Sequence, residues 1–513
     1  MPIGFDSRLR NPFVPGELFA QLKPGSRRSR AGRAGGGSRY GPVVTPTAGP
    51  EPDAAAGPGP NAAPPARPGV PRRRLLVSAA ALVGASGASA AFPSVAGAAS
   101  TAPAPGGSGS TGPARGGVVN VTDHGAVGNG ITDDTAAIQA AVDEAAARGG
   151  IAFFPPGHYR LAQPGIRVTR PVQLQGVGWE GTGVDPGTGE SASVPAGSWL
   201  FCDDPASSAI SVAAAPGGSP PSGVIIRDLA VRQPQPAGSG VFPEPVAKAG
   251  FVPVGSPFAI AIGPGCTDVL LERLFLLNVT RGISAGLTTG PPTGRLTLRG
   301  IWGQPLTDGI VLDNCQDTVR IEDVHFWPYW KLGSVADWQL EHGTGITLRR
   351  VDNPLLRGLL CFGYATGLRL DTGAPGSPHK VKVADADFDK CRAGIRVTVP
   401  ADAAGPHLFT NVSIQGPDQP RSDDASAVDI VGTGVRVAFT NLAVTHHGGS
   451  AVRVAGPGCL VLADMLCVDD VDLAGRGVAV ISAVGGAAAR IGAQRDIKIV
   501  GKGPETEGDV RMG

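Results

Sequence analysis

The feature that most constrains the fold of this 513-residue chain is a four-residue unit that recurs along most of its length. The unit consists of a polar residue or Gly, an aliphatic residue, a variable residue and usually an apolar residue. It begins at positions 228, 273, 300, 323, 350, 385, 411, 441 and 464, so that after the first gap the spacings are 27, 23, 27, 35, 26, 30 and 23 residues. A second unit, in which a small residue precedes alternating aliphatic residues, follows in many repeats. Such periods are typical of solenoids, in which each repeat supplies short strands that stack on the next repeat. We therefore expect an all-β solenoid, and the alternative is an all-β sandwich with regular turns.

One clear helix signal precedes these units, in the segment Asp123–Gly150. The run Thr132-Asp133-Asp134 supplies a capping side chain and negative charge at a helix start. Small and aliphatic residues then recur at helical spacing, and Gly149-Gly150 ends the helix. The segments 151–161 and 170–179 are typical of strands that Pro and Gly interrupt.

The same segment resembles the start of the pectate-lyase-like superfamily, in the branch that groups rhamnogalacturonases with epimerases. Members carry GAVGDGxTDDTxAIQxAI and then GGxxxxPPGxY. This chain has GAVGNGITDDTAAIQAAV and GGIAFFPPGHY within Val121–Gly178, with Asn129 in place of the usual Asp. The resemblance implies a right-handed parallel β-helix whose N-terminal end is closed by the helix. Such a cap suits a coil of strands, because the end of the coil exposes an unpaired sheet edge.

The composition divides the chain into four segments. Residues 1–70 are rich in Ala, Gly, Pro, Ser and Arg and lack apolar periodicity, which predicts disorder because too little apolar surface can be buried. In residues 71–98, Arg72–Arg74 precede an Ala-rich apolar run and Ala-x-Ala sequences, an order typical of a twin-arginine export signal. A linker with a chance cluster of arginines is the alternative. Residues 99–117 then form a linker and residues 118–505 the β-helix domain, and we expect a secreted protein.

Charge and cysteine content exclude several classes of function. The net charge is +1 and charged residues make up 17% of the chain, so we expect no nucleic-acid partner. No segment of the mature chain is apolar enough to predict a membrane span. The seven cysteines are widely spaced and include no C-x-x-C, which favours buried thiols over a zinc site. GVGWEG at 176–181 matches a dinucleotide-binding pattern, but the segment after it cannot form the required helix.

An aromatic window at Asp308–Gly345 is the best candidate for a functional site. It holds three of the six tryptophans, and its stretch from Trp327 to His342 is longer than a turn requires. Aromatic rings beside carboxylates suit a carbohydrate groove, since rings stack on sugar faces and carboxylates bind hydroxyls or transfer protons. The alternative is a hydrophobic loop that packs back on the solenoid or against another subunit. We expect catalytic groups among Asp308, His325, Asp337 and Glu341, and substrate-binding side chains at Trp302, Trp327, Tyr329, Trp330, Trp338, His342 and Arg349.

Asp308 carries the strongest expectation within this window. LTDGIVLDN around it is similar to the NTDG turn of polygalacturonases, which are hydrolases of the same fold, but their later motifs do not follow in the required order. Equivalent places in the other repeats hold no acid, so a stacking ladder does not account for Asp308, although Asp also caps turns. His325 lies one repeat further, where we expect Asp352, Asp387, Ser413 and Ala443 to be its equivalents.

Two reactions remain open from these residues. Hydrolysis requires one protonated and one ionised carboxyl group, for which Asp308, Asp337 and Glu341 are candidates. Elimination requires a base and a positive charge beside a uronate, which Asp313 and Asp317 with Arg349 could supply. No cofactor is certain, and Ca²⁺ is possible if the enzyme is a lyase. We expect a polysaccharide-cleaving or epimerising enzyme. The alternative is a non-catalytic glycan-binding or tailspike-like β-helix, for which a homotrimer is an open option.

Overall fold

The structure is a computed structural model that describes residues 117–162, 164–179, 196–236, 251–287, 290–329, 333–400, 405–417, 426–472, 479–500 and 504–513. The predicted disordered segment 1–70, the export signal 71–98 and nearly all of the linker 99–117 lie outside these residues.

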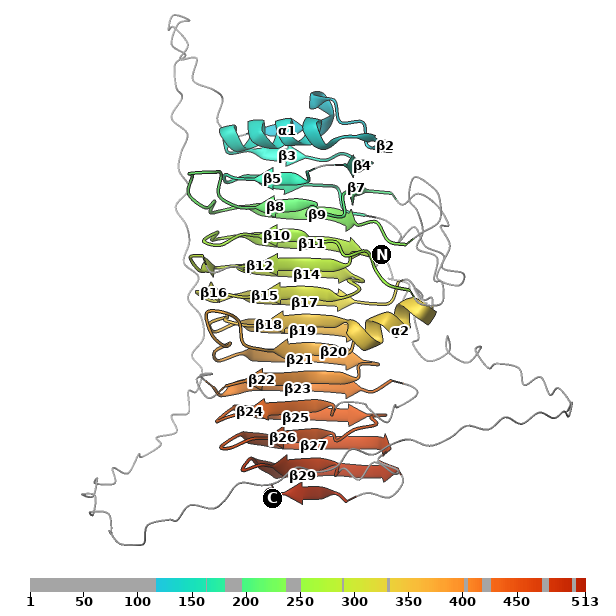
Figure 1. The fold of residues 1–513 in the computed structure, drawn as a ribbon, viewed down its shortest axis with the longest axis vertical. Coiled ribbons are helices and arrows are strands. Elements are labelled where there is room, and N and C mark those ends of the chain that lie inside the picture. Colours follow the sequence, from blue (N-terminus) through green and yellow to red (C-terminus); the bar gives the residue numbers. More distant parts are fainter. Residues whose placement is uncertain are drawn as a thin grey trace, which may run out of the picture. The chain divides into compact units, whose positions relative to one another are not determined.

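Short parallel strands dominate the described part of the chain and form two large sheets (Figure 1). The 17-stranded sheet contains β1 (Val118–Asn120), β2 (Asn129–Asp133), β3 (Ile151–Phe153), β4 (Gly157–Leu161), β6 (Gln173–Gln175), β7 (Ser198–Cys202), β9 (Ile225–Arg232), β11 (Leu270–Leu277), β14 (Thr297–Gly303), β17 (Arg320–Phe326), β19 (Leu355–Phe362), β21 (Lys382–Asp389), β23 (His407–Gln415), β25 (Arg436–Thr445), β27 (Leu460–Asp472), β29 (Ala488–Val500) and β31 (Val510–Met512).

The 12-stranded sheet contains β5 (Ile166–Val168), β8 (Ile210–Val212), β10 (Phe258–Ile262), β12 (Arg281–Ala285), β15 (Asp308–Leu312), β18 (Thr344–Leu348), β20 (Thr366–Leu370), β22 (Ala393–Val399), β24 (Val428–Gly432), β26 (Val452–Ala455), β28 (Ile481–Val484) and β30 (Thr506–Gly508). A small sheet pairs β13 (Thr293–Gly294) with β16 (Cys315–Gln316). The helices are η1 (Val121–His124, a 3₁₀ turn), α1 (Thr135–Arg148) and α2 (Gly333–His342).

From β9 onward the chain alternates between the two large sheets, apart from β13 and β16 of the small sheet. Each new strand pairs in parallel with the strand one repeat earlier, as β14 pairs with β11 and β15 pairs with β12. This arrangement is that of a parallel β-helix, in agreement with the all-β solenoid that the repeats predict. The strands continue past residue 505, where we expected the domain to end, as far as β31.

Side chains alternate between the interior of the coil and its surface, as the pleat of a strand requires. In β14, Ile301 is fully buried in the core, whereas Trp302 is 39% exposed. The same alternation places Val324 and Phe326 of β17 inside and His325 outside. We call the outward side of the 17-stranded sheet the outer face.

The recurring unit has a conformational cause. Its first residue adopts a positive φ in successive strands of the 17-stranded sheet: 59° at Asp228, 49° at Arg273, 64° at Gly300 and 55° at Asp323. Gly, Asp and Asn tolerate this left-handed conformation best, which explains why the unit begins with a polar residue or Gly.

The sequence predicts a repeat of this unit at position 350, and this prediction is wrong. Val324 pairs with Leu359, so the next equivalent position is Gly358, whose φ is 64°. The repeat is longer here because α2 is inserted between β17 and β18. The equivalent of His325 is consequently Leu360 and not Asp352.

The opening helix α1 lies at the end of the stack that carries β2 and β3 (Figure 1). Ile138 and Val142 of α1 are buried in the core that the strands share. Asp133 accepts a hydrogen bond from the Thr135 amide at 3.1 Å and thus caps the helix start, as expected. Asp134 does not cap the helix. Its carboxylate accepts bonds from the amides of Val127 and Gly128 at 2.7 and 3.0 Å, and so ties the preceding loop to the helix.

The sequence predicts buried thiols and no membrane span. All seven cysteines are free, and all but Cys467 are buried. Among the described residues, no helix combines the length and apolar character needed to cross a membrane.

Candidate functional site

A row of aromatic side chains crosses several strands of the outer face. The Trp302 ring lies 5.5 Å from the His325 ring, and His325 stacks on Trp327 with 5.9 Å between centroids. Trp327 in turn contacts Phe362 at 4.9 Å. Trp302, His325 and Leu360 are register partners on β14, β17 and β19, so the regular pairing of strands aligns this row.

A second aromatic group borders the row on the side of the earlier strands. Phe275 is buried outside the coil core, where it stacks on Trp179 at 5.5 Å and meets Tyr329 edge-on at 5.0 Å. Trp179 also contacts Trp302 at 6.5 Å between ring centroids. The two groups therefore form one continuous aromatic surface that reaches from Trp179 to Phe362.

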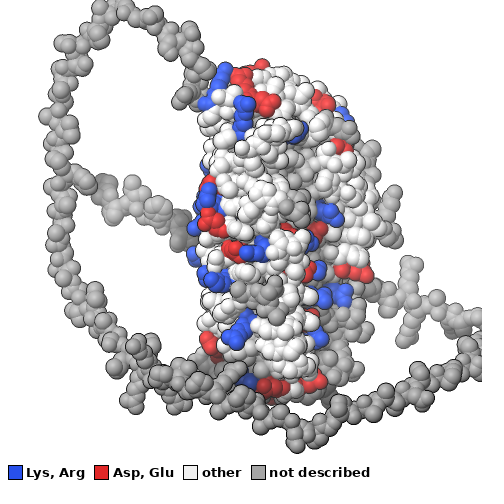
Figure 2. Space-filling view, turned by 60° about the vertical axis from the view of Figure 1, so that its left-hand side comes forward, with Lys and Arg blue, Asp and Glu red and all other residues white. Residues whose placement is uncertain are grey.

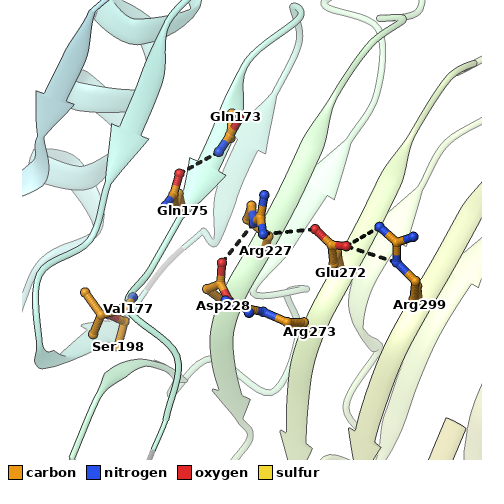
Figure 3. Close-up of polar contacts among 9 residues, drawn as sticks. All are labelled: Gln173, Gln175, Val177, Ser198, Arg227, Asp228, Glu272, Arg273 and Arg299. Atoms are coloured by element: carbon orange, nitrogen blue, oxygen red, sulfur yellow. Dashed lines mark hydrogen bonds and ion pairs between the residues drawn. The ribbon is translucent and has the colours of Figure 1, made fainter. Parts of the chain in front are cut away.

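Charged side chains form ion pairs across the same strands, as Figure 3 shows. Arg227 lies 2.9 Å from the Asp228 carboxylate and 3.1 Å from that of Glu272. Glu272 also accepts a hydrogen bond from Nε of Arg299 at 3.0 Å, and Arg273 pairs with Asp228. The acids of this group, Asp228 and Glu272, are buried, so their charges depend on the arginines.

A pocket of about 270 Å³ opens where the aromatic and charged groups meet. It is lined by Gly178, Trp179, Asp228, Arg273, Gly300, Trp302 and Asp323. Gly300 lies between Arg273 and Asp323 on the line of positive-φ residues, and its missing side chain leaves the gap between them.

Two carboxyl groups lie beyond the other end of the aromatic row. Asp389 of β21 is the register partner of Phe362, and Asp387 is the partner of Leu360. Burial raises the pKa of Asp389, and the charge of Asp387 adds to the rise while Lys390 opposes it. Burial likewise raises the pKa of Asp387, with a further contribution from Asp385. Carboxyl groups whose pKa is raised keep their proton to a higher pH than an ordinary carboxyl group and can donate it to a leaving group.

His325 and Tyr329 provide neutral polar groups within the aromatic row. Burial lowers the pKa of His325, although the charge of Asp323 opposes the shift, so the imidazole is neutral at neutral pH. The Tyr329 hydroxyl lies 3.4 Å from Nδ1 of His325, and burial raises the pKa of Tyr329 to about 12. Both side chains can therefore exchange hydrogen bonds with a neutral ligand.

Of the residues that the sequence proposes for a site, the structure brings four together: Trp302, His325, Trp327 and Tyr329. Trp330 lies outside the described residues.

Asp308 does not join this group. It begins β15 of the 12-stranded sheet, because the chain turns out of the outer face after Gly303, and it lies 3.2 Å from Nε of Arg281. Burial raises the pKa of Asp308, while the charges of Arg281, Arg349 and Arg369 oppose the rise. Asp308 and His325 thus belong to different sheets, and the common groove expected for them is not formed.

The residues considered for elimination chemistry are also separated from the aromatic row. Arg349 follows β18 and lies 3.8 Å from Asp313, whereas Asp317 pairs with Arg295 at 2.7 Å. Within the ranges that the structure describes, no group of three or more His, Cys, Asp or Glu side chains is arranged to hold a metal ion.

The long aromatic stretch contains a helix and not the expected loop. Val335 of α2 is buried against Phe251 and Leu306, with Trp338 packed on the same cluster. Trp338 also contacts His342, at 4.1 Å between ring centroids. Asp337 and Glu341, one helical turn apart, lie on the exposed side. The helix therefore turns its tryptophan toward the coil and its two acids toward solvent, and neither acid contacts Asp308 or His325.

Sequence reasoning missed Asp387, Asp389, Phe362 and Trp179. The strand sequence DADFDK contains a detectable signal, since carboxylates at alternate positions of a strand share one face. The proximity of these acids to Trp327 depends on the register of β19 with β21, which the insertion of α2 concealed.

Residues 118–206 match the family described as rhamnogalacturonase A/epimerase, pectate lyase-like. The match includes the helix and the PPG segment, and it confirms the resemblance that these motifs indicate. Mannuronan C5-epimerases AlgE6 and AlgE4 of Azotobacter vinelandii are 55% and 53% identical to this chain over 47 residues. These alignments span 9% of this chain and 5% and 8% of the two enzymes.

Two solved structures are similar over most of the described coil. The alignment with the A-module of AlgE6 from A. vinelandii covers 77% of this chain and 99% of the module, with 18% identity and a TM-score of 0.42. The catalytic domain of Agl-KA covers 77% of this chain and 68% of that domain, with 14% identity and a TM-score of 0.49. The assignment of the fold therefore rests on the strand pairing of this chain itself.

Proposed function

We propose that this chain, which carries a pectate-lyase-like parallel β-helix, is a carbohydrate-active enzyme that cleaves a polysaccharide bound along its outer face. The observation that carries the proposal is the aromatic row from Trp179 to Phe362, which ends beside two carboxyl groups with raised pKa values. A sugar chain can stack its apolar ring faces on such a row, while the carboxyl groups act on the glycosidic bond.

The favoured reaction is hydrolysis. Asp389 is the general acid, because burial raises the pKa of its carboxyl group beside the aromatic row. Asp387 is the second carboxyl group, which activates water or attacks the sugar directly. Elimination and epimerisation are less well supported, since both need a positive charge on a uronate carboxylate. Arg227, Arg273 and Arg299 of the outer face already pair with Asp228 and Glu272.

The test is a product assay with the full chain on neutral and uronate polysaccharides. Hydrolysis predicts new reducing ends without absorbance at 235 nm, whereas elimination predicts both. The double variant Asp387→Asn/Asp389→Asn should release no reducing ends. Asp496→Asn should retain activity, because Asp496 occupies the same ladder as Asp387 in β29, far from the aromatic row. Absence of product from every polysaccharide would favour the alternative of a non-catalytic glycan-binding coil.

We also propose that α1 closes the N-terminal end of a right-handed coil. The burial of Ile138 and Val142 in the shared core supports this role. Val142→Asp would place an unpaired charge in the core and should lower stability by roughly 3 kcal/mol or more, measured by chemical denaturation. Unchanged stability would contradict a docked cap.

Export through the twin-arginine pathway is a separate part of the proposal. It rests on the order of Arg72–Arg74, the apolar run and the small residues after it. The variant Arg72→Lys/Arg73→Lys should leave precursor inside the cell. Its secretion at the normal rate would contradict this pathway.

A further inference from the structure

We infer that the pocket over Gly300 is a subsite for one neutral sugar unit and that it disfavours uronates, an inference that rests on the proposed binding of a polysaccharide along the outer face. The pocket volume of about 270 Å³ is at the small end of ligand sites, as a single sugar ring requires. The Trp179 and Trp302 rings meet at 75°, so one ring can stack on the sugar face while the other closes its edge.

The floor of the pocket depends on the missing side chain of Gly300. Asp228, Arg273 and Asp323 adopt nearly the same φ and carry side chains, so the backbone conformation does not require Gly at this place. A Cβ atom on Gly300 would have its nearest contacts with Arg273 at 3.5 Å, an ordinary contact distance. A side chain would therefore fit there, and it would fill the gap that a sugar is proposed to occupy.

The charges around the pocket are balanced. Arg227, Arg273 and Arg299 face the three carboxylates of Asp228, Glu272 and Asp323, and ion pairs join all of these groups except Asp323. Figure 2 likewise shows acidic and basic side chains interspersed over one side of the molecule. No arginine of this group remains unpaired to receive a uronate carboxylate.

Asp323 determines which ligand the pocket favours. Its exposed carboxylate forms no ion pair with another described residue, and it lines the pocket opposite Arg273. A uronate would bring a second carboxylate beside it without a new counter-charge, which is unfavourable. A neutral sugar instead offers hydroxyl groups that can donate hydrogen bonds to Asp323.

The test measures binding to the Asp387→Asn/Asp389→Asn variant of the full chain, so that no ligand is cleaved. The probes are neutral hexasaccharides of gluco-, manno- and galacto-configuration, a hexa-uronate and a chitosan hexamer, each titrated by calorimetry. The best neutral probe should bind at least about 10-fold more tightly than the uronate, a difference of about 1.4 kcal/mol. Tighter binding of the uronate or of the chitosan hexamer would overturn the inference.

Two substitutions on the line of positive-φ residues locate the subsite. Gly300→Asn should weaken neutral binding about 10-fold or more, because Asn tolerates positive φ and fills the gap. Gly358→Asn is the matched control, because Gly358 has the same φ of 64° and does not line the pocket. The affinity of this variant for the neutral probe should equal that of the protein that keeps this glycine. Equal effects of both substitutions would contradict a subsite at Gly300.

A charge reversal tests the selectivity directly. Asp323→Arg should be tolerated, because Arg273 already adopts a similar positive φ on the neighbouring part of this line. The substitution supplies an unpaired cation. The ratio of neutral to uronate affinity should fall about 10-fold or more, and an unchanged ratio would contradict the role of Asp323. If the Asp387→Asn/Asp389→Asn variant binds neutral hexasaccharides but the wild-type protein cleaves no polysaccharide, the result contradicts the proposed hydrolase activity and leaves the neutral subsite intact. If wild type cleaves uronate polymers alone, only the neutral subsite fails.

Discussion

The 17-stranded sheet carries two different surfaces on one backbone pattern. One outward-facing position is in register from strand to strand. It holds Phe275 in β11, Trp302 in β14, His325 in β17 and Asp387 in β21. The same position in β23, β25 and β27 holds Ser413, Ala443 and Cys467. The strand pairing is equivalent in both regions, so the difference lies in side chains alone.

The line of positive-φ residues differs in the same way. In the later strands the side chain of Asn411 donates to Asp385 at 2.9 Å, and both residues have positive φ. Asn441 of the next strand lies outside this line, and its side chain donates to Asn411 at 2.6 Å. These side chains satisfy one another along the stack. In the earlier strands Gly300 interrupts the line and Asp323 opens onto a pocket. The comparison indicates that the later strands stabilise the coil and that the earlier strands supply the site.

The largest effect expected from this comparison concerns Asp389. Asp389→Asn should lower the turnover number by about 10²–10⁴-fold, the range for loss of a general acid or base. The loss should be smaller on a substrate with an activated aryl leaving group, which needs no protonation. The comparison with Asp387→Asn, which such a substrate should not rescue, separates the two roles. Equal rescue of both variants would contradict the assignment of Asp389 as the acid.

A smaller effect is expected from the aromatic row. Trp302→Ala should weaken polysaccharide binding by about 5–10-fold, because one ring contributes about 1 kcal/mol beyond its buried area. Leu462→Ala is the control, since Leu462 is a similarly exposed hydrophobic residue (42%, against 39% for Trp302) in β27. Affinity electrophoresis of both variants measures the difference. Similar losses would remove the distinction between the two regions.

The row of side chains that runs from Asp228 through Asp323 and Asn411 to Asn441 predicts opposite effects in its earlier and later strands. Asn441→Ala removes a side-chain hydrogen bond and should lower stability by about 1 kcal/mol without a change in affinity. Asp323→Asn should leave the free energy of unfolding nearly unchanged and alter the affinity for the oligosaccharide bound at the pocket. Denaturant titration and calorimetry on both variants give the two values, and loss of affinity in Asn441→Ala alone would reverse the assignment.

The smallest effect concerns the pH dependence of stability. Because burial raises the pKa of Asp389, folding favours its protonated form, and the folded state loses stability as the pH rises through that pKa. Asp389→Asn removes this loss, so its melting temperature should exceed that of wild type by about 1–2 °C near pH 7. The two should melt together near pH 3, where the carboxyl group is protonated in both states. A lower melting temperature of the variant at pH 7 would mean that the carboxylate stabilises the fold.

The fold was predictable because its causes are local and repeated. Residues with positive φ recur within the strands, mostly as Asp, Asn or Gly, and the helix before them has its own start and end signals. The site was predictable mainly around its aromatic residues: His325, Trp327 and Tyr329 stand close in sequence, and Trp302 lies one repeat earlier. Asp308 was misplaced because a four-residue turn between β14 and β15 carries the chain to the other sheet. Asp387 and Asp389 were missed because their neighbours on the outer face come from a strand beyond the inserted helix α2.

The most direct test is a crystal structure of the Asp387→Asn/Asp389→Asn variant with the tightest-binding neutral hexasaccharide. We expect the sugar chain to lie along the outer face, with one ring over Gly300 between Trp179 and Trp302 and a glycosidic bond beside residues 387 and 389. A sugar chain bound to the 12-stranded sheet near Asp308, or against the exposed side of α2, would contradict this expectation.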